Sequence, residues 1–288
     1  MPEREPTHPD GSDLMTTTSD VEPAAPGAAP TTHRRIEAKG LGKTFQTRNG
    51  PRAVLDGLDF RVDANEFVSI VGPSGAGKTT LLRCIAGLER PTAGGVYVDG
   101  DEVHEPPRQV ALVFQDYGRS LYPWLRVEGN VALPLRTKRL SKKARRTAAL
   151  EALEAVGLAD AAHQYPWQLS GGMQQRVAIA RALAYEPEAL LMDEPFASVD
   201  AQTRSDLEDL VLSIRSRFDM TVILVTHDVD ESVYMADRVL VLGKAPARII
   251  EEVVVELPAE RDQISTKSDP AFVSARTRVL TAVQNAKG

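Results

Sequence analysis

The sequence predicts an α/β fold in which strands alternate with helices around a largely parallel sheet. Three observations lead to this prediction. A buried apolar strand runs into a glycine-rich loop, two later apolar strands are each followed by a helical pattern, and residues from about 116 to 168 carry no strong strand pattern. Alternating strands and helices favour a parallel sheet that binds ligands at the carboxyl ends of its strands.

The first half of the chain supplies most of the predicted strands. IEAKGLGKTF, which begins near residue 35, alternates apolar and polar residues and predicts an edge strand. Residues 67–71 predict a buried strand, and residues 79–87 predict the helix that follows the glycine-rich loop. VYVDG and QVALVFQ predict two further strands.

A helical segment is predicted at about 116–168. SKKARRTAALEALEAVGL reads as an amphipathic helix capped by Ser141 and closed near Gly157. The short run of basic residues on this helix is interpreted as a solvated face rather than a binding patch. We therefore expect a helical subdomain inserted into the α/β domain.

The α/β pattern resumes after this segment. ALLMDEP predicts a strand, 201–218 a helix, TVILVTH a strand, and a further helix begins near residue 228. RVLVLGKAPARIIEEVVVEL predicts the last strands, and a final helix is expected at about 270–283. The expected organisation is one domain at 34–258, followed by a linker and short helix at 259–288. Residues 1–33 are poor in large apolar side chains and are predicted to be disordered.

Composition narrows the class of protein. The 288 residues carry a net charge of −6, which does not suit a nucleic-acid binder. Cys84 is the single cysteine, so no internal disulfide can form, and its apolar surroundings predict a buried thiol. There is no secretory signal and no run of about 18 apolar residues, so we expect a cytoplasmic chain that does not itself cross the membrane.

The glycine-rich loop predicts binding of a nucleoside triphosphate. It matches G-x-x-x-x-G-K-[ST] between a predicted strand and a predicted helix, as that motif requires. Its backbone N–H groups can form an anion-binding nest, Lys78 can reach the β- and γ-phosphates, and the Thr79 hydroxyl can ligate Mg²⁺. The predicted ATP-binding residues here are Gly72, Pro73, Ser74, Gly75, Ala76, Gly77, Lys78, Thr79 and Thr80.

Two acids close the strand pattern of ALLMDEP. Asp193 suits the Mg²⁺ shell, and Glu194 suits a general base that polarises the attacking water. Taken alone, such a pair could equally be strand-end acids that cap the next helix.

LSGGMQQR offers a second phosphate-binding surface. The Ser170 hydroxyl and the N–H groups of two glycines stand at the start of a predicted helix. One chain cannot wrap one ATP with both surfaces if they lie far apart. A two-fold, head-to-tail pair solves this, because each chain then covers the ATP of the other.

The ordered set of motifs resembles the nucleotide-binding subunits of ABC transporters, over residues from about 35 to 245. The resemblance implies a P-loop ABC cassette with a RecA-like core, an antiparallel β subdomain and the helical insertion. It also implies that Phe45 stacks on adenine, that Gln115 senses Mg²⁺ and the γ-phosphate, and that His227 holds the γ-phosphate. The implied contacts to the ATP of a partner copy are Leu169, Ser170, Gly171, Gly172, Gln174 and Asp200.

The implied metal ligands are Thr79, Gln115 and Asp193, with Glu194, His227 and Gln115 as the catalytic set. Because no catalytic position is degenerate, we expect a hydrolysing subunit that uses ATP and Mg²⁺.

The finer resemblance is to the nitrate, sulfonate and taurine importers. It is carried by FQDYGRSLYPWLRVEGNVALPL and HDVDESVYMADRVLVLGKAPARI. It implies a homodimer on the inner face of the membrane, bound to separate permease subunits. A solute-binding protein on the outside would deliver the solute to these permease subunits. Tyr122, Pro123 and Trp124 would then receive the permease, unless they are core residues of the helical subdomain. An exporter subunit and a non-transport ABC ATPase remain as alternatives.

Overall fold

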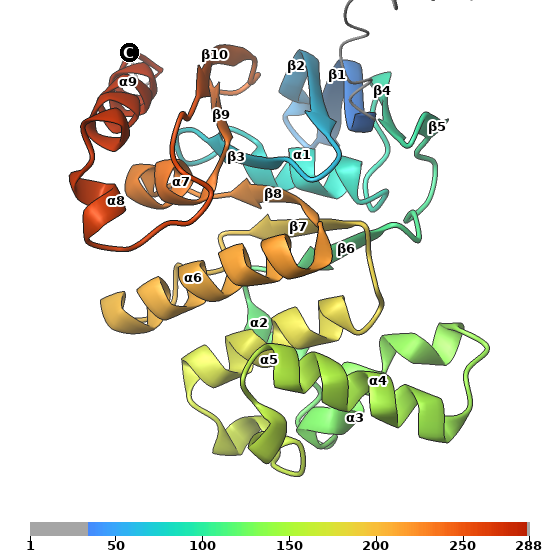
Figure 1. The fold of residues 1–288 in the computed structure, drawn as a ribbon. Coiled ribbons are helices and arrows are strands. Elements are labelled where there is room, and N and C mark those ends of the chain that lie inside the picture. The colour runs from blue at the N-terminus through green and yellow to red at the C-terminus, as the bar shows by residue number, and fades with distance from the viewer. Residues whose placement is uncertain (1–33, 287–288) are drawn as a thin grey trace, which may run out of the picture. The chain divides into compact units, whose positions relative to one another are not determined.

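The computed structural model describes residues 34–286, so the predicted disordered segment 1–33 lies outside the described residues. Within them, a six-stranded sheet forms the centre of the fold, in the order β10-β9-β3-β8-β7-β6 (Figure 1). All its pairings are parallel except the antiparallel β9–β10 pair. Its strands are β3 (Phe67–Val71), β6 (Val110–Val113), β7 (Ala189–Asp193), β8 (Thr221–Val225), β9 (Arg238–Leu242) and β10 (Ile249–Val254). Every residue of β3, β7 and β8 is buried, as expected for parallel strands covered on both faces.

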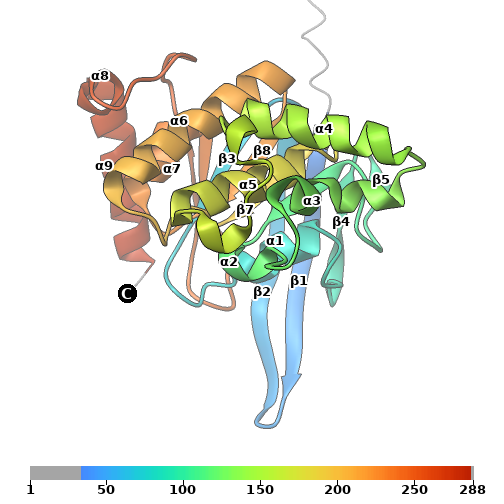
Figure 2. The same cartoon turned by 90° about the horizontal axis from the view of Figure 1, so that it is seen from below.

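A second sheet is antiparallel and has the order β2-β1-β4-β5. Its strands are β1 (Arg34–Thr47), β2 (Gly50–Asp63), β4 (Ala93–Val98) and β5 (Asp101–Glu102). The expectation of an edge strand at IEAKGLGKTF is wrong, because β1 pairs with β2 on one side and β4 on the other. The chain reverses after Thr47, and Gly50 has a φ of 102°, which glycine adopts without strain. Figure 2 shows the β1–β2 hairpin projecting beyond the helices.

Several helices begin at a residue whose side chain caps the first turn. Ser141 accepts from the Ala144 N–H at 3.1 Å at the start of α4, and Asp200 accepts from the Thr203 N–H at 3.0 Å at the start of α6. The α-helices are α1 (Lys78–Ile85), α2 (Tyr117–Ser120), α3 (Val127–Ala132), α4 (Lys142–Ala155), α5 (Gly171–Leu183), α6 (Ala201–Phe218), α7 (Val229–Met235), α8 (Ser265–Ser268) and α9 (Pro270–Asn285). Within residues 34–286, α3, α4 and α5 are connected by three 3₁₀ turns: Pro134–Thr137, Ala159–Ala161 and Pro166–Gln168.

The period of two along the central strands builds a core on each face of the six-stranded sheet. Val68 and Ile70 face a cluster that includes α1 and the antiparallel sheet, whereas Phe67 and Val71 face a cluster that includes α5, α6, α7 and α9. Cys84 belongs to the first cluster and is buried, as predicted. Burial raises the pKa of this thiol to about 11.

The helices α2 to α5 lie together below the central sheet in Figure 1 and in front of it in Figure 2. Among residues 34–286, no helix is both long enough and apolar enough to span a bilayer. The carboxyl ends of the neighbouring strands β3, β7 and β8 place three predicted motifs side by side: the glycine-rich loop, the acid pair and His227.

Candidate active site

The loop between β3 and α1 forms a compact nest. Gly75 and Gly77 have φ values of 79° and 91°, a region that L side chains rarely adopt. A Cβ atom on Gly77 would also lie 2.6 Å from Val54 Cγ1, so only glycine fits there. The Lys78 ammonium is folded back into the loop, where Nζ donates to the Gly72 carbonyl at 2.9 Å. The nest and its cation are therefore shaped for an anion before one binds.

The cost of burying the Lys78 ammonium is only partly compensated by nearby negative charges. Its side chain is 6% exposed, and desolvation lowers the pKa of its ammonium, although the negative charges of Glu194 and Asp193 oppose that shift. Phosphate oxygens bound on the loop would accept hydrogen bonds from this partly desolvated ammonium and offset part of its desolvation.

Asp193 ends β7 beside the first turn of α1. Thr79 Oγ1 donates to Asp193 Oδ1 at 3.1 Å, so the hydroxyl and the carboxylate predicted to share a metal are adjacent. Burial raises the pKa of Asp193, and the hydrogen bond from Thr79 opposes this effect. Hard oxygen donors of this kind suit Mg²⁺, which uses one or two protein groups and takes the rest of its shell from phosphate and water. The described residues contain no cluster of three or more His, Cys, Asp or Glu side chains that could hold a metal.

Glu194 follows Asp193 in a strained backbone conformation. Its φ is 43°, in the left-handed region, and its N–H donates to the Val225 carbonyl of β8 at 2.8 Å. That bond fixes the turn by which the chain leaves β7. The turn aims the Glu194 side chain at the loops of the neighbouring strands.

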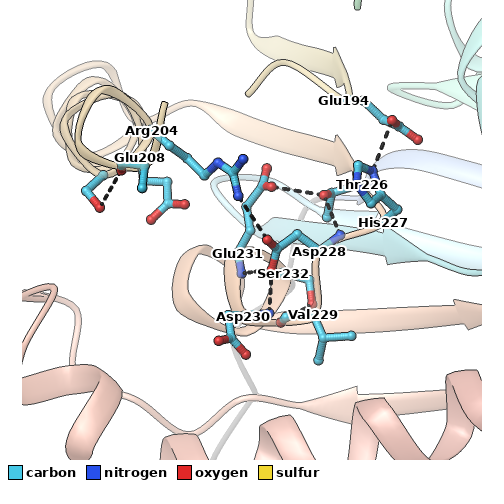
Figure 3. A network of polar contacts seen from close by, with 12 residues as sticks. Glu194, Arg204, Glu208, Thr226, His227, Asp228, Val229, Asp230, Glu231 and Ser232 are labelled. Carbon is cyan, nitrogen blue, oxygen red and sulfur yellow. Dashed lines mark hydrogen bonds and ion pairs between the residues drawn. The ribbon is translucent and has the colours of Figure 1, made fainter. Parts of the chain in front are cut away.

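Three predicted side chains from distant parts of the sequence converge on the Glu194 carboxylate. The Nδ1 atom of His227 lies 3.1 Å from Oε2, the Gln115 Nε2 atom lies 3.4 Å from the same oxygen, and Lys78 Nζ lies 4.0 Å from Oε1. Figure 3 shows the contact between His227 and Glu194. A carboxylate held in this way beside a phosphate-binding loop can accept a proton from water.

An open cavity of about 470 Å³ adjoins the glycine-rich loop, a volume typical of small-molecule sites. Phe45 stands in its wall, and Lys43 Nζ lies 4.8 Å from the centre of the Phe45 ring. The sequence prediction did not include Arg52, although Arg52 pairs across the hairpin with Phe45. Recognising the hairpin after Thr47 would have found it. The lining residues are Phe45, Thr47, Arg52, Val54, Ser74, Gly75, Ala76, Gly77, Lys78, Thr79, Thr80 and Glu194.

The second predicted phosphate-binding surface lies outside this cavity. Ser170 caps α5 and is exposed, and its Oγ accepts from the Met173 N–H at 3.3 Å. Leu169 is buried, so its side chain belongs to the core. Gln174 Nε2 donates to the carbonyls of Pro166 and Leu169 at 3.1 and 3.2 Å, so this side chain holds the loop of its own chain. The predicted contacts of these residues with a partner's ATP stay predictions.

Gly172 brings this loop against the start of α6. A Cβ atom on Gly172 would lie 2.4 Å from Thr203 Cγ2, and Thr203 is held by Asp200 through bonds from its N–H at 3.0 Å and its hydroxyl at 2.7 Å. These two bonds are the main reasons that the pKa of Asp200 is lowered. The surfaces carrying Gly171 and Asp200 are thereby neighbours within one chain.

The fold, the phosphate nest and the acids at the ends of parallel strands define a P-loop ATPase. A family model described as "ABC transporter" matches residues 55–197, and the chain belongs to this family of ATP-hydrolysing cassettes. It is 43% identical over 244 residues to a nitrate import ATP-binding protein of Synechococcus elongatus, covering 83% of this chain and 88% of the relative. It is 44% identical over 247 residues to an aliphatic sulfonates import ATP-binding protein of Bacillus licheniformis, covering 85% and 91%.

A solved structure gives the same fold. The dimeric post-hydrolysis state of the ATP-binding cassette MJ0796, bound to ADP and Pi, matches with a TM-score of 0.69 and 34% identity. The match covers 77% of this chain and all of that one. The predicted cassette fold is thus confirmed.

Proposed function

We propose that the chain powers import of a small solute of the nitrate, sulfonate or taurine type through separate membrane subunits. The single observation that carries the ATPase part is the convergence of His227, Gln115 and Lys78 on the Glu194 carboxylate. The importer part rests on the similarity of the chain to nitrate and sulfonate import ATP-binding proteins over about nine-tenths of the length of those relatives.

In the proposed reaction the loop N–H groups and Lys78 bind the phosphates of ATP, and the Phe45 ring receives the adenine. Glu194 accepts a proton from the attacking water, and the contact from His227 orients its carboxylate. Thr79 and Asp193 would hold Mg²⁺, which supplies charge neutralisation on the phosphates. Gln115 donates toward Glu194 and so joins this site to the α2–α5 helices.

A dimer completes the proposed site. Ser170 and Gly171 are exposed and do not line the cavity of their own chain, so they are available to cover the ATP of a second copy. A two-fold, head-to-tail pair makes both contacts equivalent. The solved structure of the related cassette MJ0796 is dimeric, which supports the dimer part of this proposal.

The proposed permease contact is an exposed aromatic surface beside α2. Trp124 is 70% exposed and Tyr122 40% exposed, and their rings meet edge to face with centroids 5.2 Å apart. The two rings adjoin a groove lined also by Phe114, Leu133 and Pro134. Exposure opposes the alternative that Trp124 is a core residue of the helical subdomain. We propose that this surface places the chain at the inner face of the membrane.

Uptake measurements test the proposal. A deletion strain is compared with wild type for uptake of labelled nitrate, taurine and an alkanesulfonate, with wild-type and Glu194→Gln copies for complementation. The proposal predicts loss of uptake of one solute, restored by the wild-type copy alone. Unchanged uptake of all of them would refute the assigned solute class while leaving the ATPase intact.

Co-purification tests the membrane subunits separately. Trp124→Ala is expected to retain ATP hydrolysis in the isolated chain and to lose its integral membrane partner. Phe218→Ala, which removes an exposed aromatic at the end of α6, is the matched control and should retain the partner. If the wild-type chain itself brings down no membrane protein, the non-transport alternative replaces the importer.

A further inference from the structure

His227 lies in the short link between β8, which ends at Val225, and α7, which begins at Val229. Its side chain is 59% exposed, so packing alone does not hold the imidazole in place. Its two neighbours in the chain, Thr226 and Asp228, are held by several hydrogen bonds. Figure 3 shows that these anchors come from α6 and from the first turn of α7.

Thr226, on the amino-terminal side, is 1% exposed. Its N–H donates to the Ile70 carbonyl at 3.2 Å, and its hydroxyl donates to Glu231 Oε2 at 3.0 Å. The same hydroxyl oxygen accepts from the Asp228 N–H at 3.0 Å. One hydroxyl therefore ties both ends of the His227 link to α7.

Asp228, on the carboxyl-terminal side, uses both carboxylate oxygens. Its Oδ1 caps α7 by accepting from the N–H groups of Asp230 and Glu231 at 2.9 and 3.1 Å. Its Oδ2 accepts from Arg204 Nη1 at 3.2 Å, and Arg204 lies one turn into α6. This ion pair connects the link to the helix that begins at Asp200.

From this geometry we propose that Thr226 and Asp228, anchored by Glu231 and Arg204, are positioning residues that hold the His227 imidazole against the Glu194 carboxylate. With the backbone of the link tied on both sides of His227, mainly the side-chain torsions of the histidine remain free. Fewer free torsions mean a smaller entropy loss when the histidine meets the reacting groups. The inference rests on the proposed role of His227 in hydrolysis.

Glu231 is suited to this role because the residue is only 5% exposed, and the charged groups that act on its carboxyl are Glu208 and Arg204 from α6 and Asp228 from the link. Burial raises the pKa of Glu231 to about 8, so the group is mostly neutral at pH 7. A neutral acid can still accept from the Thr226 hydroxyl. Glutamine has the same shape and acceptor, which makes Glu231→Gln a conservative variant.

The test measures kcat and KM for ATP with the full chain, first for His227→Ala and then for variants of its anchors. Thr226→Val keeps the shape of the side chain but removes both hydroxyl bonds, and Arg204→Met removes the ion pair with Asp228. Each should lower kcat by about tenfold or more, with KM little changed. The conservative variants Thr226→Ser and Glu231→Gln should keep most of the wild-type kcat. Arg217→Met, at the far end of α6, is the control and should leave kcat unchanged.

The decisive comparison is made in the His227→Ala background. If Thr226 and Arg204 act through the histidine, their substitutions cause no further loss of kcat there. The same tenfold loss in that background, or wild-type kcat for both Thr226→Val and Arg204→Met, would overturn the inference. Wild-type kcat for His227→Ala itself would instead refute the proposed function of the histidine. Thermal unfolding of each variant shows which of them are folded.

Discussion

Glu231→Gln should change how the free energy of unfolding depends on pH. Burial raises the folded-state pKa of this carboxyl from its usual 4.5 to about 8, with Glu208 and Asp228 adding to the shift and Arg204 and the Thr226 bond opposing it. The unfolded chain therefore releases this proton at lower pH than the folded chain. The contribution of Glu231 to stability is fully present below about pH 4.5 and is lost as the pH rises toward 8.

The magnitude follows from the width of this window. Each pH unit between the two pKa values changes the free energy of unfolding by about 1.4 kcal/mol. As the pH rises from 5.5 to 8, the titration of Glu231 therefore lowers the free energy of unfolding of the wild-type protein by about 3 kcal/mol. Glutamine does not titrate. The stability of Glu231→Gln relative to wild type should thus increase by about 3 kcal/mol over that range.

Urea unfolding of the two proteins at several pH values measures this difference, because the other titrating groups cancel between them. Glu154→Gln, on the exposed face of α4, is the matched control for loss of one carboxyl. A difference between Glu231→Gln and wild type that stays constant from pH 5.5 to pH 8 would refute the assignment of a buried, neutral Glu231.

Two further predictions concern packing. Gly172→Ala should destabilise the fold by about 1 to 3 kcal/mol, because its Cβ would overlap Thr203 Cγ2. Adding Thr203→Ser, which deletes that methyl but keeps the hydroxyl bonded to Asp200, should recover most of the loss in denaturant melts, and no recovery would contradict the contact. Cys84, buried and with its thiol pKa raised to about 11, should react with a thiol reagent only after denaturant is added; rapid labelling of the native protein would contradict its burial.

Much of the site was predictable because its chemistry lies in contiguous motifs. The loop up to Thr79 and the acid pair at Asp193 are short strings whose structural setting follows from one strand and one helix. Helix starts at Ser141 and Asp200 were predictable for a similar reason, since a cap is a local hydrogen bond.

What the sequence did not predict depends on contacts between distant segments. The inner position of β1 follows from its pairing with β4, about fifty to sixty residues further along the chain, which no local pattern encodes. The ion pair between Arg204 and Asp228 depends on how α6 packs beside the His227 link. Likewise, Gln174 bonds to its own loop because of the turn at Pro166, although its sequence context was equally consistent with a contact to a partner copy.

The most direct test of the account is the rate of ATP hydrolysis by Glu194→Gln compared with wild type. Glutamine keeps the shape of the side chain but cannot accept the proton of the attacking water. We expect this variant to bind ATP, to form a dimer that ATP stabilises, and to lose turnover by at least about a hundredfold. Hydrolysis at the wild-type rate would show that Glu194 is not the general base and would contradict the mechanism built on it.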